Sequence, residues 1–153
     1  MRWKTHLAFG FLSGLFALNH LRIGNKLLFF IFVLFGSLLP DVDHPESKLG
    51  RKVKIIGLIF RHRGIFHSIW AGAFLSAVLW FFVNKSCAIG LFIGYFSHLL
   101  IDGFTIQGIN FLHPIGNLHL KGFIETGTVG EWVLFGIIVF LILAELGKAF
   151  SIL

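Results

Sequence analysis

IFHSIWAGAFLSAVLWFFV, residues 65–83, is a run of 19 residues that contains no Lys, Arg, Asp or Glu. A helix that crosses the hydrocarbon core of a bilayer needs about 20 mainly apolar residues, so this run predicts a membrane helix. Glu131–Gly147 is a second run of sufficient length. Thr5–Leu18, Leu27–Leu39 and Ser86–Ile101 are apolar but shorter, so they must recruit flanking residues or enter the membrane only in part.

The composition of the whole chain supports the same class of protein. Of the 153 residues 56% are hydrophobic and 13% are charged, whereas a soluble domain usually carries about 25% charged residues. We therefore expect an all-α integral membrane protein with one membrane-embedded domain over residues 1–153. About five membrane helices are expected, near 5–18, 27–39, 65–83, 86–101 and 131–147, with loops at 40–64 and 102–130.

The distribution of charge predicts an orientation in the membrane. The formal net charge of +6 is explained better by basic cytoplasmic loops than by nucleic-acid binding, because no soluble domain is expected that would display the basic residues. Nine of the 13 Lys and Arg residues fall in the N-terminal tail and the two long loops. The positive-inside rule places these parts in the cytoplasm. No Ala-x-Ala cleavage site follows Leu7–Leu18, so we expect this segment to be retained in the membrane.

Histidine and acidic residues gather at the ends of the apolar runs. They are His6, Asp41, Asp43, His44, His62, His67, His98 and Asp102. On the predicted topology all of them fall at the cytoplasmic ends of helices, whereas scattered interfacial residues would divide between the two faces. Ionisable groups are costly at membrane depth, so this grouping predicts one shared site at the cytoplasmic ends of the helices.

These residue types are ligands of Zn²⁺ and related metals. His98 and Asp102 are four residues apart, so on a helix they share one face. Either both bind a metal, or the carboxylate orients the imidazole. Asp41 and Asp43 point the same way in an extended turn and can chelate or bridge. Such a set is large enough for one or two ions, and two ions suit phosphoester hydrolysis because they stabilise the entering and the leaving oxygen.

Three motifs carry a resemblance to a known family, PDVDH (40–44), RHRGIFHS (61–68) and HLLIDGFT (98–105). Through them the chain resembles the YdjM-like family over residues 5 to about 114. These are bacterial and archaeal inner-membrane proteins, some of them LexA-regulated, that are described as metal-dependent hydrolases. Their ordered motifs are similar to those of zinc-dependent phospholipase C. The resemblance implies metal ligands at His6, Asp41, His62, His67, His98 and Asp102, with Asp43 and His44 as further ligands or as supports for them.

The leading hypothesis is a metal-dependent hydrolase in a prokaryotic inner membrane, with its N-terminus and its site facing the cytoplasm. The substrate would be an anionic phosphoester, such as a membrane phospholipid, and no nucleic acid. The cofactor would be a divalent metal, zinc before manganese or iron. His62 or Asp43 would move protons, and Arg61 or Arg63 would hold the phosphate. The oligomeric state is left open by the sequence.

Two other functions fit part of the sequence. Lys54 and Arg61 have the Lys-x6-Arg spacing of metal-independent phosphatidic-acid phosphatases, and His98 and Asp102 match the last motif of that family. Its Pro-Ser-Gly-His motif is absent, so we interpret the match as chance. A non-enzymatic membrane protein, either a divalent-cation carrier or a structural protein of a stress response, is the third hypothesis. Carriers usually place their ligands near the bilayer midplane, whereas here the ligands are predicted at one face.

Overall fold

The computed structural model describes residues 1–43 and 64–151, and the side chains of residues 1–42 and 64–148. Within this part the chain is mainly helical. The α-helices are α1 (Trp3–His20), α2 (Lys26–Gly36), α4 (Ile69–Phe82), α5 (Lys85–Gly103) and α6 (Val129–Ser151). Two short 3-10 helices, η1 (Leu39–Asp43) and η3 (Ile65–His67), and two short strands, β1 (Ile109–Asn110) and β2 (His119–Leu120), complete the described elements.

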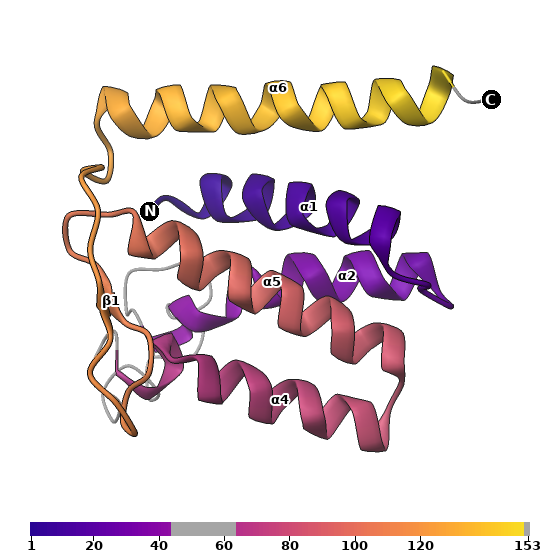
Figure 1. The fold of residues 1–153 in the computed structure, drawn as a ribbon, viewed down its shortest axis with the longest axis horizontal. Helices are drawn as coiled ribbons and strands as arrows, with labels where there is room; N and C mark the ends of the chain where they lie inside the picture. Colours follow the sequence, from indigo (N-terminus) through magenta and orange to yellow (C-terminus); the bar gives the residue numbers. More distant parts are fainter. Residues whose placement is uncertain (44–63, 152–153) are drawn as a thin grey trace.

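The helices lie side by side, and successive ones run in opposite directions (Figure 1). Helix α5 is central and packs against α1, α2 and α4, whereas α6 packs against α1. As a result the start of α1, the end of α5 and the start of α6 lie at the same end of the bundle. The fold thus brings together helix ends that the sequence predicts on one face of a membrane.

Polar residues define where three of the helices begin. Asn25 accepts a hydrogen bond from the backbone N–H of Leu28 (3.0 Å), and Asn84 accepts one from that of Ser86 (2.8 Å). Ser68 in the same way accepts one from the N–H of Ala71 (3.4 Å). These side chains satisfy N–H groups that have no partner in the first turn of a helix.

Helices α2 and α5 approach each other closely because glycines line their contact. A Cβ atom at Gly94 would lie 2.0 Å from the carbonyl oxygen of Val33, and one at Gly90 would lie 2.4 Å from that of Phe29. On the facing helix, a Cβ atom at Gly36 would lie 2.5 Å from the carbonyl oxygen of Leu91. Small residues spaced four apart allow helix backbones to meet in this way, as in many membrane proteins.

The segment after α5 contains more structure than the loop predicted at 102–130. Strands β1 and β2 pair antiparallel, with Ile109 opposite Leu120. Ile109 is buried with Tyr95 and Leu99 of α5, and this cluster forms the core on the α4 side of the bundle. The backbone N–H of Ile69 donates to the carbonyl of Phe111 (3.0 Å), which joins the segment to the start of α4.

The all-α class is confirmed, but five membrane helices are not. By length and composition two of the described helices can cross a membrane, Lys85–Gly103 and Val129–Lys148. Helix α2 has 11 residues and α4 has 14, and at 1.5 Å per residue these correspond to about 17 and 21 Å, short of the roughly 30 Å of a hydrocarbon core. The predicted span 65–83 divides into η3 and α4 at Ser68, and the predicted span 27–39 ends at Gly36, before Pro40.

Candidate metal centre

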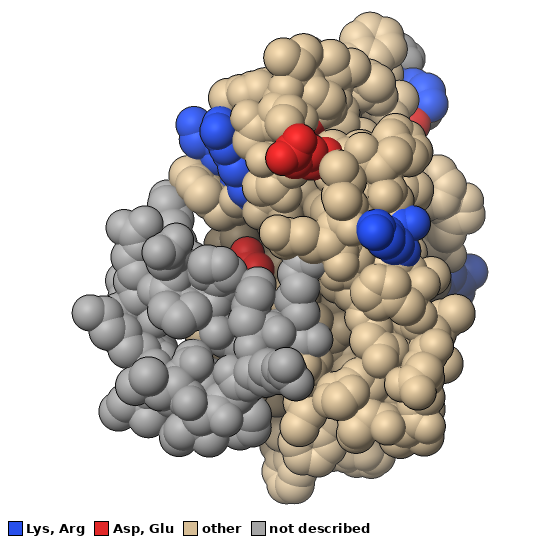
Figure 2. Space-filling view, turned by 90° about the vertical axis from the view of Figure 1, so that its left-hand side faces the viewer, with Lys and Arg blue, Asp and Glu red and all other residues tan. Residues whose placement is uncertain are grey.

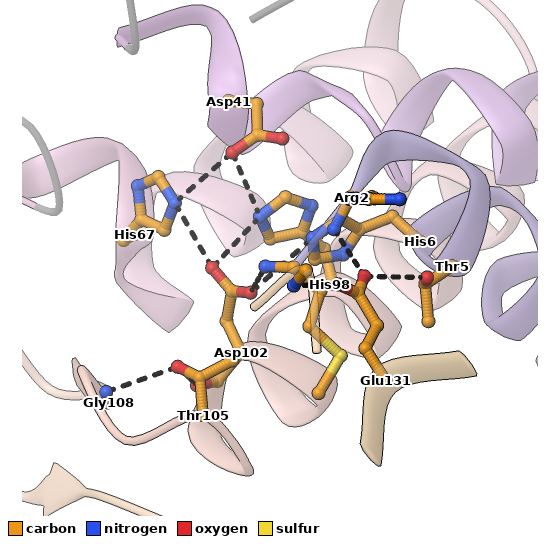
Figure 3. A network of polar contacts seen from close by, with 12 residues as sticks. Arg2, Thr5, His6, Asp41, His67, His98, Asp102, Thr105, Gly108 and Glu131 are labelled. Carbon is orange, nitrogen blue, oxygen red and sulfur yellow. Dashed lines mark hydrogen bonds and ion pairs between the residues drawn. The ribbon is translucent and has the colours of Figure 1, made fainter. Parts of the chain in front are cut away.

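Four side chains from three parts of the chain point at one another, at the end of the bundle where α5 ends. Asp41 belongs to η1, His67 ends η3, and His98 and Asp102 lie on the last turns of α5 (Figure 3). One nitrogen or oxygen atom from each lies within 4.8 Å of those of the other three. We call these four residues the metal-ligand group.

The ligand atoms alternate between nitrogen and oxygen around the group (Figure 3). The Nε2 atom of His98 lies 3.7 Å from Asp41 Oδ1 and 3.7 Å from Asp102 Oδ2. The Nε2 atom of His67 lies 3.8 Å from each of the same two oxygens. In a tetrahedral zinc site with bonds of about 2.1 Å, neighbouring ligand atoms are roughly 3.4 Å apart, so these four nitrogen–oxygen distances are close to those expected around a metal ion.

A backbone carbonyl sets the tautomer of His98. The Nδ1 atom of His98 lies 2.8 Å from the carbonyl oxygen of Ser37, and since a carbonyl can only accept, Nδ1–H is the donor. The Nε2 atom therefore carries the lone pair and faces the two carboxylates. It makes no hydrogen bond within the described part of the chain although it is buried. A carbonyl behind a metal-binding histidine is a common way to orient the ring.

The close glycine contacts hold Ser37 in this position. A Cβ atom at Gly94 would lie 2.9 Å from the backbone nitrogen of Ser37, and one at Gly10 of α1 would lie 2.7 Å from its Cβ. The carbonyl that orients His98 is thus fixed by two helices that can approach only because these positions lack a side chain. Sequence analysis missed this role of Ser37, but the Gly90-x-x-x-Gly94 spacing was a visible signal for close packing.

The turn that carries His67 is fixed by a tyrosine of α5. The hydroxyl of Tyr95 donates to the carbonyl oxygen of Phe66, and both Tyr95 and His67 are fully buried. The rings of His67 and His98 meet edge to face, with centroids 5.4 Å apart. Helix α5 therefore supplies two members of the metal-ligand group and also places a third.

Asp102 uses its two oxygens differently. Its Oδ2 atom faces His67 and His98, whereas its Oδ1 atom accepts from the amino group of Met1 at 2.7 Å and lies 3.4 Å from Nε2 of His6. The ring of His6 stacks on that of His98, with centroids 3.9 Å apart. His6 is therefore next to the metal-ligand group, on the opposite side of Asp102, and is outside the set of four converging atoms.

Glu131 fixes the start of α1 beside this centre. Its Oε1 atom accepts from the backbone N–H of Arg2 (2.6 Å) and from the hydroxyl of Thr5 (2.9 Å). Its Oε2 atom accepts from the N–H of Gly127 (2.6 Å). A carboxylate at a helix start is favourable, because the first N–H groups lack partners there. Glu131 thus holds α1 and α6 together and keeps His6 near Asp102, without entering the metal-ligand group.

Burial makes the arrangement suited to a cation. His67 and His98 are fully buried, and Asp102 is 2% exposed. The side chain of Asp41 is 19% exposed and is the most accessible of the four. Carboxylates that leave water need compensating positive charge, and the amino group of Met1 is one source of it, at Oδ1 of Asp102. A divalent ion between the four ligand atoms would compensate both carboxylates.

Four of the eight predicted ligands meet in the described part of the chain, and a fifth, His6, lies beside them. The other predicted site residues lie outside the part that the structure describes. They are His44, Arg61, His62, Arg63 and the side chain of Asp43. Their roles therefore stay predictions. His20 is exposed in the last turn of α1, at the opposite end of that helix from His6.

Comparison with known proteins identifies the family of this chain. Residues 1–152 match the family described as YdjM inner membrane protein. The chain is 32% identical over 142 residues to the uncharacterized protein YvsG of Bacillus subtilis (strain 168), covering 86% of this chain and 85% of that protein. It is 33% identical over 129 residues to the inner membrane protein YdjM of Escherichia coli (strain K12), covering 74% of this chain and 66% of the relative.

A protein of the same name from Shigella flexneri matches to the same extent. No solved structure matches the chain. The family match over nearly the whole chain includes every element that forms the metal-ligand group. The chain therefore belongs to the YdjM inner membrane protein family.

Proposed function

We propose that this protein is a membrane-bound, metal-dependent hydrolase that cleaves a phosphoester, with a phospholipid as the preferred class of substrate. The observation that carries the proposal is the convergence of four ligand atoms within 4.8 Å, from the buried His67, His98 and Asp102 and the partly exposed Asp41. Side chains that only stabilise a fold seldom bring two imidazoles and two carboxylates to one point with the ligand nitrogens facing inward.

The donor set favours zinc. Two imidazole nitrogens and two carboxylate oxygens suit Zn²⁺, whereas Mg²⁺ and Ca²⁺ are bound mainly through oxygen. Manganese and iron accept the same ligands and are the alternatives that metal analysis would reveal. The hydrogen bond from His98 to Ser37 supports any of these metals, because it presents the lone pair of Nε2 to the ion.

When bound, such an ion supplies a Lewis acid that activates water and neutralises charge on a phosphoryl group. The protein contributes orientation and exclusion of water. His67, His98 and Asp102 form the closed wall of the group, and Asp41 lies on its more accessible side. A substrate would therefore approach past Asp41. In this proposal Asp43 and His62 transfer protons, and Arg61 and Arg63 hold the phosphate.

The proposed setting is the cytoplasmic face of a prokaryotic inner membrane, with the chain crossing the bilayer several times. The bias of Lys and Arg toward the N-terminal tail and the two long loops supports this orientation. The metal-ligand group comes from helix ends and not from helix centres, which supports chemistry at the membrane surface over transport through the bilayer. A metal-independent phosphatase is distinguished from this proposal by its resistance to chelators.

The first test is the metal content of protein purified in detergent. We expect one or two equivalents of zinc, manganese or iron in the wild type, and none in the variant His67→Ala/His98→Ala. The matched control is His20→Ala/His119→Ala, which removes two exposed histidines outside the metal-ligand group and should keep the metal. Release of phosphate or of a phosphorylated headgroup from defined phospholipids is then measured with each protein.

Chelation followed by metal return gives the second arm of the test. The proposal predicts that hydrolysis is lost on chelation and restored by the metal found in the wild type. Full hydrolysis by metal-free protein would exclude a metal-dependent mechanism. Metal uptake into proteoliposomes without hydrolysis of any phosphoester would identify a carrier instead.

A further inference from the structure

A cavity of about 200 Å³ opens between the starts of α1 and α6, beside the metal-ligand group. Its lining includes the cations Arg2 and Lys4 and the aromatic side chains Trp3, Trp132 and Phe135. Figure 2 looks at this end of the molecule, where Lys, Arg, Asp and Glu side chains lie in separate patches on a surface made mostly of other residues. The metal-ligand group does not include any of the residues that line this cavity.

The charge of the cavity favours an anion. Arg2 and Lys4 are both exposed, so their charged groups are available to a ligand. The one carboxylate in the lining, Glu131, is buried and accepts from two backbone N–H groups and a hydroxyl. The negative charge of Glu131 is therefore largely balanced by these donors and repels an anion in the cavity less than a free carboxylate would. Helices α1 and α6 both begin here, so neither helix presents its negative end to the cavity.

The aromatic side chains indicate where the anion comes from. The guanidinium of Arg2 lies 5.4 Å from the ring centroid of Trp132, and the ammonium of Lys4 lies 5.9 Å from that of Trp3. Trp132 is 53% exposed and lies at the start of α6, a helix with other large apolar side chains that are also exposed. Tryptophan and basic residues mark the level of lipid headgroups in membrane proteins, and the apolar face beyond them suits acyl chains.

We propose that the α1–α6 cavity binds the phosphate of an anionic phospholipid, with Arg2 and Lys4 on the phosphate and Trp3 and Trp132 beside the glycerol region. The site deepens the proposed function by naming where a phosphate-bearing lipid would sit next to the metal-ligand group. Met1 and His6, which flank the cavity residues in the chain, both approach Asp102, so the two sites are adjacent. Binding itself does not depend on hydrolysis.

The test measures lipid binding to detergent-purified, metal-free protein by native mass spectrometry. Phosphatidylglycerol, phosphatidylcholine and inorganic phosphate are the three probes. We expect phosphatidylglycerol to bind about tenfold more tightly than phosphatidylcholine. The variant Arg2→Gln/Lys4→Gln should weaken this binding about 30-fold, from the roughly fivefold effect of each basic residue near an anionic headgroup. The backbone N–H that Arg2 donates to Glu131 is retained in this variant.

The matched control is Arg22→Gln/Lys26→Gln, which removes two exposed cations from the other end of the bundle. It should leave binding of phosphatidylglycerol unchanged. A second variant, Trp132→Ala, keeps both cations and should still weaken binding, because Arg2 loses the ring beneath it. Equal loss in the two double variants would overturn the proposal, since it would show a general effect of charge.

Competition separates a lipid from a free anion. Failure of millimolar inorganic phosphate to displace phosphatidylglycerol supports a lipid site. Complete displacement would overturn the assignment to lipid and leave a site for small phosphate ions. Because metal-free protein is used, loss of hydrolysis in the tests above does not affect this result, and the two proposals can fail separately.

Discussion

Helices α5 and α6 are similar in length and are the two described helices apolar enough to span a membrane, but their surroundings differ. In the candidate span of α5, 67% of the residues are buried, whereas in that of α6 only 11% are. Helix α5 contacts three other helices and supplies His98 and Asp102. Among the described elements helix α6 packs mainly against α1, and it presents large apolar side chains such as Phe140 and Leu143 to the outside.

The difference teaches that length and hydropathy do not reveal which helix builds a site. What separates the two sequences is the distribution of small and polar residues. Gly90, Gly94, Ser97, His98 and Asp102 follow one another along α5 and are all buried. In α6, Gly136 and Gly147 have open space around them, and a Cβ atom at Gly130 would make only ordinary contacts of 3.6 Å or more. Small residues let helices meet, and polar residues then find partners in the resulting contact.

The largest effect is expected when a methyl group is placed between α2 and α5. In Gly94→Ala the new Cβ would lie 2.0 Å from the carbonyl of Val33, so the helices must separate. We expect a loss of more than about 3 kcal/mol in the free energy of unfolding, measured by titration with a denaturing detergent. Metal affinity should also fall, because Ser37 would move away from His98.

Gly136→Ala on α6 is the matched control, because no atom lies within 4 Å of the position of its Cβ. Alanine is favoured over glycine in a helix by up to about 1 kcal/mol, so stability should be unchanged or slightly higher. Equal losses in the two variants would contradict the distinction between a packed helix and an exposed one.

The second effect concerns charge on the two helices. Asp102→Asn removes a ligand of the proposed metal and the partner of the Met1 amino group, so metal affinity should fall by more than about 100-fold. Glu145→Gln on α6 removes an exposed pair with Lys148, and should change neither metal content nor stability by more than about 0.5 kcal/mol. The metal content and the free energy of unfolding are measured for both variants. Retention of metal by Asp102→Asn would remove Asp102 from the ligand set.

The sequence predicted the helical class and the end of the bundle where the site lies. The alternation of apolar runs and polar ends was sufficient for this prediction. When successive helices run in opposite directions, the start of one helix and the end of the next lie at the same end of the bundle. It also predicted Asp41, His67, His98 and Asp102 as members of one group, from residue type and from position at helix ends. Their separation in sequence was no obstacle, since the topology alone placed them near one another.

Other features could not be read from the sequence in the same way. The lengths of α2 and α4 depend on where Pro40 and Ser68 end or start a helix, and hydropathy does not report this. The carbonyl of Ser37 acts through its backbone, so its side chain gave no signal. His6 was predicted as a ligand from its place at a helix start and from the family resemblance, and this role stays a prediction. Its ring stacks on that of His98 beside the four converging atoms, a placement that the packing of α1 decides.

A smaller effect is expected at the one buried ionisable residue in the described part of α6. Glu131→Gln keeps one acceptor oxygen but turns an amide donor toward N–H groups of Gly127 or Arg2. The unmatched donors should lower the free energy of unfolding by about 1–3 kcal/mol. Metal content should be retained, since Glu131 is outside the metal-ligand group. If the variant lost its metal with only a small loss of stability, this prediction would be wrong. The position of α1 would then be needed for metal binding, although Glu131 is outside the metal-ligand group.

The smallest effect is expected on the exposed face of α6. Phe140 is 69% exposed, so Phe140→Ala should change the free energy of unfolding in detergent by less than about 0.5 kcal/mol. Leu99 of α5 is fully buried, and Leu99→Ala should lower it by about 2–5 kcal/mol because a cavity is left. The same denaturing titration measures both. A loss above 1 kcal/mol in Phe140→Ala would mean that the exposed face of α6 packs against protein in the purified particle, and a dependence of that loss on protein concentration would identify a second copy of the chain as the partner.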